Sequence, residues 1–95
     1  MTAYIVFTRE RTIDEKELEN YRPKARASME GRPVTRLAAY GKQKVLEGKP
    51  VEGVVILSFP SFEEATEWYH STAYQDACTY RFKGAEYRVV IVEGE

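Results

Sequence analysis

Side chains that could do chemistry are few and lie mainly in the second half of the chain. There is one histidine, His70, and one cysteine, Cys78. His70 follows Trp68-Tyr69 near the end of a predicted helix, where an imidazole can act as a general acid or base or can simply interact with the helix dipole. Cys78 lies in an apolar stripe with no base nearby and is typical of a small core residue. A lone histidine argues against a transition-metal site, and we expect neither a metal nor a cofactor.

Tyrosine is unusually frequent, with seven copies in 95 residues. Five of them fall at positions expected to face inward, and each brings a hydroxyl group that needs a partner: Tyr4, Tyr21, Tyr69, Tyr74 and Tyr87. Such a set suits a pocket for an aromatic molecule. It equally suits a core and an interface, because interfaces are enriched in tyrosine. We take Tyr21, Tyr69 and Tyr74 as candidate ligand-binding residues, with packing alone as the alternative.

Two arginines complete the candidate site. Arg81 lies one turn after Ala77-Cys78 on a predicted helix, and Arg36 lies on a predicted strand. A guanidinium group that points into a cleft can bind a carboxylate through two hydrogen bonds. The alternative is that each arginine pairs with a neighbouring acid at the surface, where such pairs contribute little.

Charge and composition exclude several classes of partner. Fourteen basic and fifteen acidic residues give a net charge of −1 with no long block of one sign, so we expect no binding to nucleic acid or to a membrane surface. The opening MTAYIVFTRE lacks the basic leader and apolar run of a signal peptide, and no stretch approaches ~20 apolar residues. With a single cysteine, these features favour a soluble, cytoplasmic protein.

These side chains must be positioned by one domain, residues 1–95, which the apolar periodicity divides into alternating elements. Strands are predicted at residues 2–8, 34–46, 53–59 and 86–93, and helices at residues 12–29 and, in two segments, 61–84. The order strand-helix-strand-strand-helix-strand is the split βαββαβ arrangement of ferredoxin-like folds, an α+β class with a four-stranded antiparallel sheet and its helices on one face.

Local signals add detail to this outline. Pro23 lies inside the first helix and predicts a kink or a helix in two pieces. Gly41 predicts a bend or bulge in residues 34–46, close to a sheet edge, and the boundaries of that strand stay open. Ser61 with Glu64 forms a capping box. The apolar stripes of the last two helical segments include Phe62, Ala65 and Tyr69, with Trp68 on the flank, and then Tyr74, Ala77, Cys78 and Phe82.

The strands are apolar on both faces, although the helices can cover only one. Ala3, Ile5 and Phe7 alternate with Tyr4 and Val6, and the same holds for VVIL at residues 54–57 and for VVIV at residues 89–92. An antiparallel face left in water should be polar, and burying each large apolar side chain contributes ~1.5–3 kcal/mol. We therefore expect a second copy of the chain to cover the open face, in a two-fold dimer with sheets packed face to face.

The segments FPSFEEA at residues 59–65 and WYHSTAYQ at residues 68–75 resemble the domain of unknown function 1330 family, as do VLEG at residues 45–48 and VVIVEG at residues 89–94. The likeness covers essentially the whole chain. It implies membership of the dimeric α+β barrel superfamily, which includes cofactor-less monooxygenases and small isomerases, and it implies no agreed reaction. Family members often place His-Gly-Gly-Arg after the first helix, where this chain has EGRPVTR at residues 30–36.

These observations lead to one main functional hypothesis and one alternative. The first is a small homodimer that binds an aromatic or carboxylate-bearing molecule between sheet and helices through Tyr21, Tyr69, Tyr74, Arg81 and Arg36. If it catalyses a reaction, cofactor-less proton transfer, isomerisation or monooxygenase-like chemistry would fit, with His70 as the acid or base. The alternative is a non-catalytic assembly or stress-associated module with no ligand.

Overall fold

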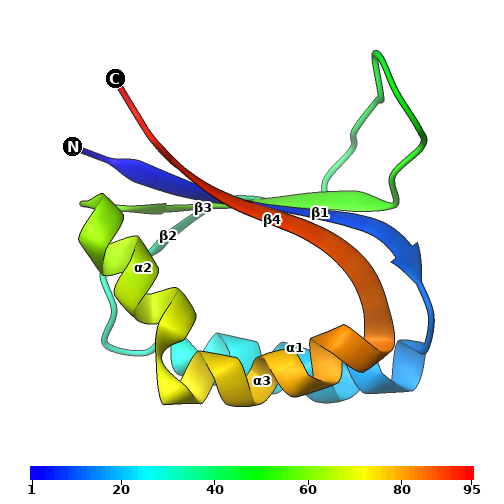
Figure 1. The fold of residues 1–95 in the computed structure, drawn as a ribbon, viewed down its shortest axis with the longest axis horizontal. Coiled ribbons are helices and arrows are strands. Elements are labelled where there is room, and N and C mark those ends of the chain that lie inside the picture. Colours follow the sequence, from blue (N-terminus) through cyan, green and yellow to red (C-terminus); the bar gives the residue numbers. More distant parts are fainter.

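A computed structural model describes all residues 1–95 as one antiparallel sheet covered on one face by helices (Figure 1). The elements in chain order are β1 (Ala3–Thr12), α1 (Glu15–Ser28), β2 (Thr35–Ala39), β3 (Gly53–Phe59), α2 (Phe62–His70), α3 (Thr72–Gly84) and β4 (Ala85–Glu93). The strand order is β2-β3-β1-β4, and every neighbouring pair is antiparallel. The predicted ferredoxin-like βαββαβ fold is confirmed, with α2 and α3 as consecutive helices in the place of its second helix.

The helices begin where short polar side chains can satisfy the free backbone N–H groups of the first turn. The Asp14 carboxylate accepts a hydrogen bond from the backbone N–H of Lys16 at 3.0 Å, and the Ser61 hydroxyl accepts one from the N–H of Glu64 at 3.1 Å. Ser71 caps α3 in the same way while also ending α2. The cap predicted at Ser61 is confirmed, and Asp14 is the cap of α1.

Two predicted details of the first half are wrong. Of the two alternatives predicted at Pro23, the helix in two pieces is wrong, because α1 runs unbroken from Glu15 to Ser28. Pro23 is exposed, and the packing of α1 against α3 holds the helix together despite the missing N–H. The second strand is much shorter than residues 34–46. It is an edge strand with its irregularity between Arg36 and Ala38 rather than near Gly41, and residues 40–52 form a loop.

The apolar stripes predicted for α2 and α3 are correct for most of their residues, which are buried, but wrong for their two phenylalanines. Phe62 and Phe82 are exposed, at 41% and 60%. Trp68 and Arg81 occupy the buried positions instead. Adjacent residues on a helix differ by about 100° in direction, so a hydrophobic pattern alone does not decide which of two neighbouring stripes faces the sheet.

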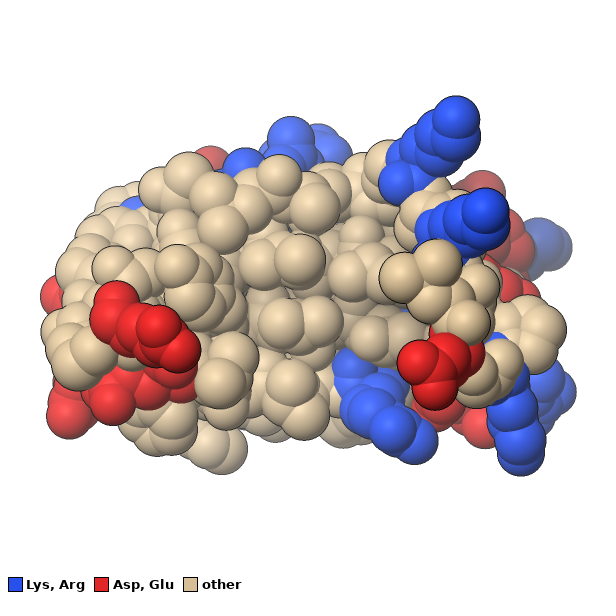
Figure 2. Space-filling model, turned by 90° about the horizontal axis from the view of Figure 1, so that it is seen from above, with Lys and Arg blue, Asp and Glu red and all other residues tan.

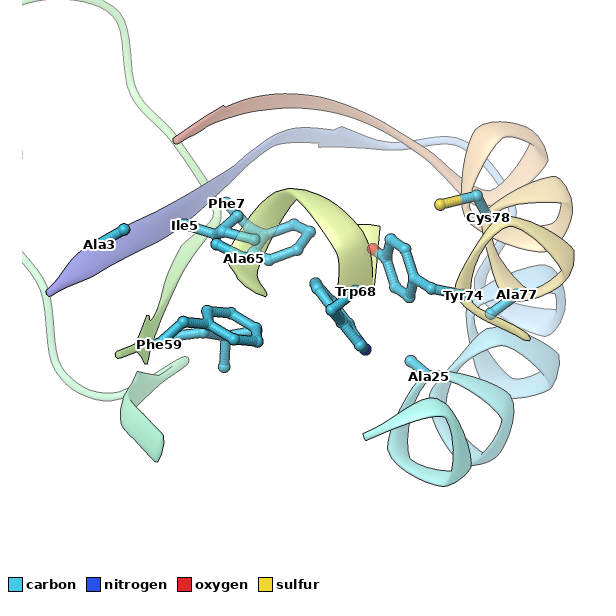
Figure 3. Packing of buried hydrophobic residues seen from close by; sticks show 11 residues of the cluster. Ala3, Ile5, Phe7, Ala25, Phe59, Ala65, Trp68, Tyr74, Ala77 and Cys78 are labelled. Carbon is cyan, nitrogen blue, oxygen red and sulfur yellow. The ribbon is translucent and has the colours of Figure 1, made fainter. Parts of the chain in front are cut away.

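Aromatic rings fill the space between the sheet and the helices, with Trp68 at the centre (Figure 3). Its ring centroid lies 4.1 Å from that of Tyr74, 5.7 Å from that of Phe59 and 6.4 Å from that of Phe7. The indole N–H donates to the Ser28 hydroxyl at 3.1 Å, so the one polar atom of this fully buried ring has a partner. This packing fixes α2 beneath the strands.

The other face of the sheet carries no helix (Figure 1). Strand register places six apolar side chains on it: Tyr4, Val6, Val54, Ile56, Val90 and Val92. Figure 2 shows this face as a broad uncharged area, with charged side chains gathered toward its margins. Tyr4 therefore does not point toward the helices, in contrast to the expectation for the tyrosines. The apolar open face predicted from the strand pattern is present.

Candidate functional site

A cleft lies between α1 and the part of the sheet formed by β2 and β3. Beside it, α1 packs along α3 rather than onto the strands. The cleft has a volume of about 270 Å³. Its walls are mainly apolar, and include Phe7, Val55 and Leu57 from the sheet and Ala25 and Met29 from α1. It is thus suited to an apolar or aromatic molecule.

All of the charged side chains that line this cleft are arginines: Arg22, Arg26 and Arg36. Arg22 is engaged, because its guanidinium lies 2.7 Å from the Glu15 carboxylate. Arg26 and Arg36 make no ion pair and no side-chain hydrogen bond in the structure. Two unpaired guanidinium groups with no lining carboxylate give the cleft a positive potential that favours an anionic ligand.

Tyr40 and Tyr87 line the cleft as a pair, with their hydroxyl oxygens 2.5 Å apart. Tyr40 has a φ of 58°, in the left-handed region that a residue with a side chain seldom adopts. Gly53 makes room for its ring, because a Cβ at that position would lie 2.4 Å from it. The Arg9 guanidinium lies 4.8 Å from the ring centroid. These contacts hold Tyr40 in its strained conformation.

Behind the cleft, the hydroxyl groups of Tyr21 and Tyr74 are 2.7 Å apart. Burial raises the pKa of Tyr21 to about 12, and burial also raises the pKa of Tyr74 above its usual range. The pKa of Tyr40 is raised as well, first by burial and then by its hydrogen bond to Tyr87. At neutral pH these phenols are therefore protonated, so they can donate hydrogen bonds to a ligand but cannot act as bases.

The structure divides the predicted site residues between different places. Tyr21 and Arg36 line the cleft, whereas Tyr74 lies behind Tyr21 and is fully buried. Tyr69 and Arg81 line a second cavity, of about 500 Å³, near α3 and β4. Tyr87 borders both cavities.

His70 lines neither cavity. It is exposed at the last position of α2, and its ring lies edge-on to that of Tyr69 with 5.3 Å between the centroids. His70 therefore lines neither candidate binding region, and the acid–base role predicted for it stays a prediction. No group of three His, Cys, Asp or Glu side chains lies close enough to hold a metal ion, and the longest helix is too short and too polar to cross a bilayer.

Tyr40 lines the cleft with an unusual backbone conformation, and no feature of the sequence pointed to it as a site residue. It follows a short edge strand and precedes a polar loop, which are positions with no periodic pattern. Its partner Tyr87 is 47 residues further along the chain. The only signal available was the high tyrosine count, which does not identify pairs.

The sequence model of a family described as domain of unknown function DUF1330 matches residues 2–95. No curated protein sequence matches the chain. The match confirms the resemblance seen in residues 59–75 and in the last strand.

Solved structures share the fold at low sequence identity. A protein of unknown function from Rhodopseudomonas palustris has a TM-score of 0.74 and 15% identity, over 99% of this chain and 82% of that one. A dimeric protein of unknown function with a ferredoxin-like fold from Bacteroides fragilis has a TM-score of 0.67 and 11% identity, over 98% and 96%. SnoaB, a cofactor-independent oxygenase from Streptomyces nogalater, has a TM-score of 0.63 and 9% identity, over 99% and 93%. At these identities the likeness shows the fold alone.

Proposed function

This chain belongs to the DUF1330 family, and we propose that within it the protein is a homodimer that binds a small aromatic carboxylate in the cleft between α1 and the sheet. The observation that carries this proposal is the pair of unpaired arginines, Arg26 and Arg36, beside an apolar and aromatic cavity with no lining acid. An arginine held without a carboxylate partner next to an apolar surface is suited to bind the carboxylate of a ligand whose rings fill the cavity.

The size of the cleft limits the ligand. A volume of about 270 Å³ lies just below the range typical of sites for drug-sized molecules, ~300–1,000 Å³. A compound of one or two rings is the appropriate size. Burial raises the pKa of Tyr21 and of Tyr40, so both phenols are protonated at neutral pH, and no His, Asp or Glu lines the cleft. These features favour binding over proton abstraction.

The dimer is proposed through the open face of the sheet. Six apolar side chains gather there, among them Ile56 and Val6 at the centre and Val90 and Val92 toward the β4 edge. A contiguous apolar surface of this kind is typical of an interaction site. An isologous contact between two such faces covers both at once and closes the assembly. The similar structure from Bacteroides fragilis is described as a dimeric protein, which supports a dimer of this chain.

The ligand proposal is tested by isothermal titration calorimetry with 2-naphthoate and with its uncharged amide. The expected result is saturable binding of the carboxylate and at least about tenfold weaker binding of the amide, because a charge-assisted hydrogen bond contributes ~1.5–3 kcal/mol. The double variant Arg26→Gln/Arg36→Gln should lose the preference for the carboxylate. Arg32→Gln is the matched control, since Arg32 lies just before β2 and lines neither cavity.

Two results would contradict this function. One is equal affinity for naphthoate and its amide, which would remove the role of the arginines. The other is the absence of binding for a broad panel of aromatic acids, which would favour the alternative of an assembly module whose tyrosines serve packing alone.

A further inference from the structure

We propose that the second cavity is a separate binding site, in which Arg81 and the Tyr69 hydroxyl hold the carboxylate of a small, singly charged acid. This cavity has a volume of about 500 Å³ and is separate from the cleft between α1 and the sheet, with Tyr87 bordering both. The inference does not depend on the function proposed for the cleft, because none of the cleft's arginines lines this cavity.

Arg81 is a buried cation that forms no ion pair with any acid of the chain. Only 3% of the residue is exposed, yet none of the four ion pairs in the structure includes it. Buried charges in proteins are ordinarily paired, because removing an unpaired charge from water is costly. Burial alone would lower the pKa of Arg81, because it disfavours the charged guanidinium. The electrostatic interaction with Tyr74 and the hydrogen bond to Cys78 outweigh it and raise the pKa of Arg81 above its usual range. Arg81 is therefore positively charged under all ordinary conditions.

The N–H donors of Arg81 are largely unused. Its Nη2 reaches the Tyr69 hydroxyl only at 3.5 Å and the Cys78 sulfur at 3.7 Å, and its Nε has no hydrogen-bond partner. Three aromatic rings surround the guanidinium, with centroids 5.0–5.8 Å away. These rings interact with the charge, but they leave the Nε–H group without a hydrogen-bond acceptor. The Nε of Arg9 also lacks a hydrogen-bond partner, but the Glu52 carboxylate lies 3.1 Å away and pairs with its charge, whereas Arg81 is in no ion pair.

Arg81 lies in the wall of this cavity, so its guanidinium group adjoins any ligand bound there, although the Nε atom itself is buried. Tyr69 lines the same cavity, and its hydroxyl can accept from Arg81 while donating its own proton to a carboxylate oxygen. Phe82, Tyr87 and Val89 supply an apolar wall for the rest of the molecule. The site thus offers a cation, a hydroxyl donor and an apolar surface, which match a short organic acid.

Two acids that also line the cavity define the charge of the ligand. The strand irregularity between Arg9 and Arg11 re-aims Glu10, which lines the cavity with Glu86. Each acid faces an arginine outside the cavity: Arg88 lies 3.8 Å from Glu10, and Arg11 pairs with Glu86. Their remaining negative potential disfavours a doubly charged anion such as phosphate more strongly than a monocarboxylate.

The test is a titration of the native protein with sodium propionate, followed by NMR of the arginine Nε–H groups, with sodium chloride at matched ionic strength as the control. We expect one Nε–H resonance, absent from Arg81→Lys, to shift and saturate with propionate and not with chloride. Inorganic phosphate should bind more weakly than propionate. The proposal is overturned if no Nε–H resonance responds, if the response persists in Arg81→Lys, or if phosphate binds more tightly.

Two further variants keep the test decisive where Arg81→Lys does not fold. Glu10→Gln removes an exposed like charge and should tighten propionate binding about two- to fivefold, whereas an unchanged or weaker affinity contradicts the proposal. The double variant Arg26→Gln/Arg36→Gln should leave the propionate response intact. Loss of the response in that variant would place the binding in the cleft, and absence of naphthoate binding to the cleft would leave this site unaffected.

Discussion

The two faces of the sheet are built from adjacent residues of the same strands, yet they differ in what covers them. On the helix side, Ile5, Phe7 and Leu57 are at most 4% exposed. On the open side, Val90 and Val92 are 49% and 51% exposed. Strand propensity cannot explain the difference, because consecutive residues of one strand share it. The open face is as apolar as a buried one without being buried, which is typical of a surface used for association.

The alternation of polar and apolar residues along a strand therefore distinguishes a monomeric domain of this fold from one that associates with another chain. A monomer of this fold would need polar residues at alternate positions of β1, β3 and β4. Ser58, Thr8 and Arg88 are the polar residues at such positions: Ser58 is next to the end of β3, and Thr8 pairs with Arg88 beside the Val6–Val90 pair. The centre of the face stays apolar, so the contact is expected to be centred on Ile56 and Val6.

Truncation of the central ring on the helix side should have the largest effect. Trp68→Ala removes a fully buried indole from contact with three rings, and is expected to lower the free energy of unfolding by about 3–5 kcal/mol. Phe82→Ala, which truncates a ring that is 60% exposed, is the control and should cost about 1 kcal/mol or less. Urea denaturation measures both. Equal costs would show that the helix side is not the principal core.

High pH should destabilise the helix side next. The pKa of Tyr21 is about 12 in the folded protein, against 10.0 for a free tyrosine, because burial disfavours the phenolate. Above pH 10 the unfolded chain loses this proton first, so stability present at neutral pH is lost between pH 10 and about 12, by roughly 2–3 kcal/mol. Urea denaturation at several pH values should show a shallower decline for Tyr21→Phe. An identical decline in the variant would contradict the burial of this phenol.

The smallest effect on stability is expected for substitutions at two adjacent valines of β4. Val89→Thr and Val90→Thr place the same isosteric hydroxyl on opposite faces of β4. If a second copy covers the open face, both should cost about 1–2 kcal/mol, and only the cost at Val90 should depend on protein concentration. Thermal unfolding at several concentrations provides the measurement. A cost near zero for Val90→Thr at every concentration would mean that this part of the face stays wet.

Much of the fold could be predicted because it depends on local signals. Strand β3 spans the residues expected, Ser61 caps the helix expected, and the division of side chains between the two faces follows from a period of two. Where the signal depends on a tertiary contact, the prediction was wrong. Residues 40–46 extend the apolar pattern of β2, but there they form an exposed loop, because β3 pairs only with Thr35–Ala39.

The candidate site was less predictable for a related reason. Residue type identified five possible ligand contacts, and all except the fully buried Tyr74 line a cavity: Tyr21, Arg36, Tyr69 and Arg81. Their division into two cavities depends on the position of Tyr87, which no local pattern specifies. The same holds for the Tyr40–Tyr87 contact, which joins a strained loop residue to a distant strand.

Sedimentation equilibrium at micromolar concentrations tests directly whether two copies of the chain associate through the open face of the sheet. We expect the native protein to have a mass of about 22 kDa, twice the 11.0 kDa of the chain. Ile56→Lys places a charge at the centre of the open face, and the mass of this variant should be about half as large. Ala73→Lys, at an exposed position of α3, should keep the larger mass. A native protein that sediments as a single chain throughout this range would contradict the account.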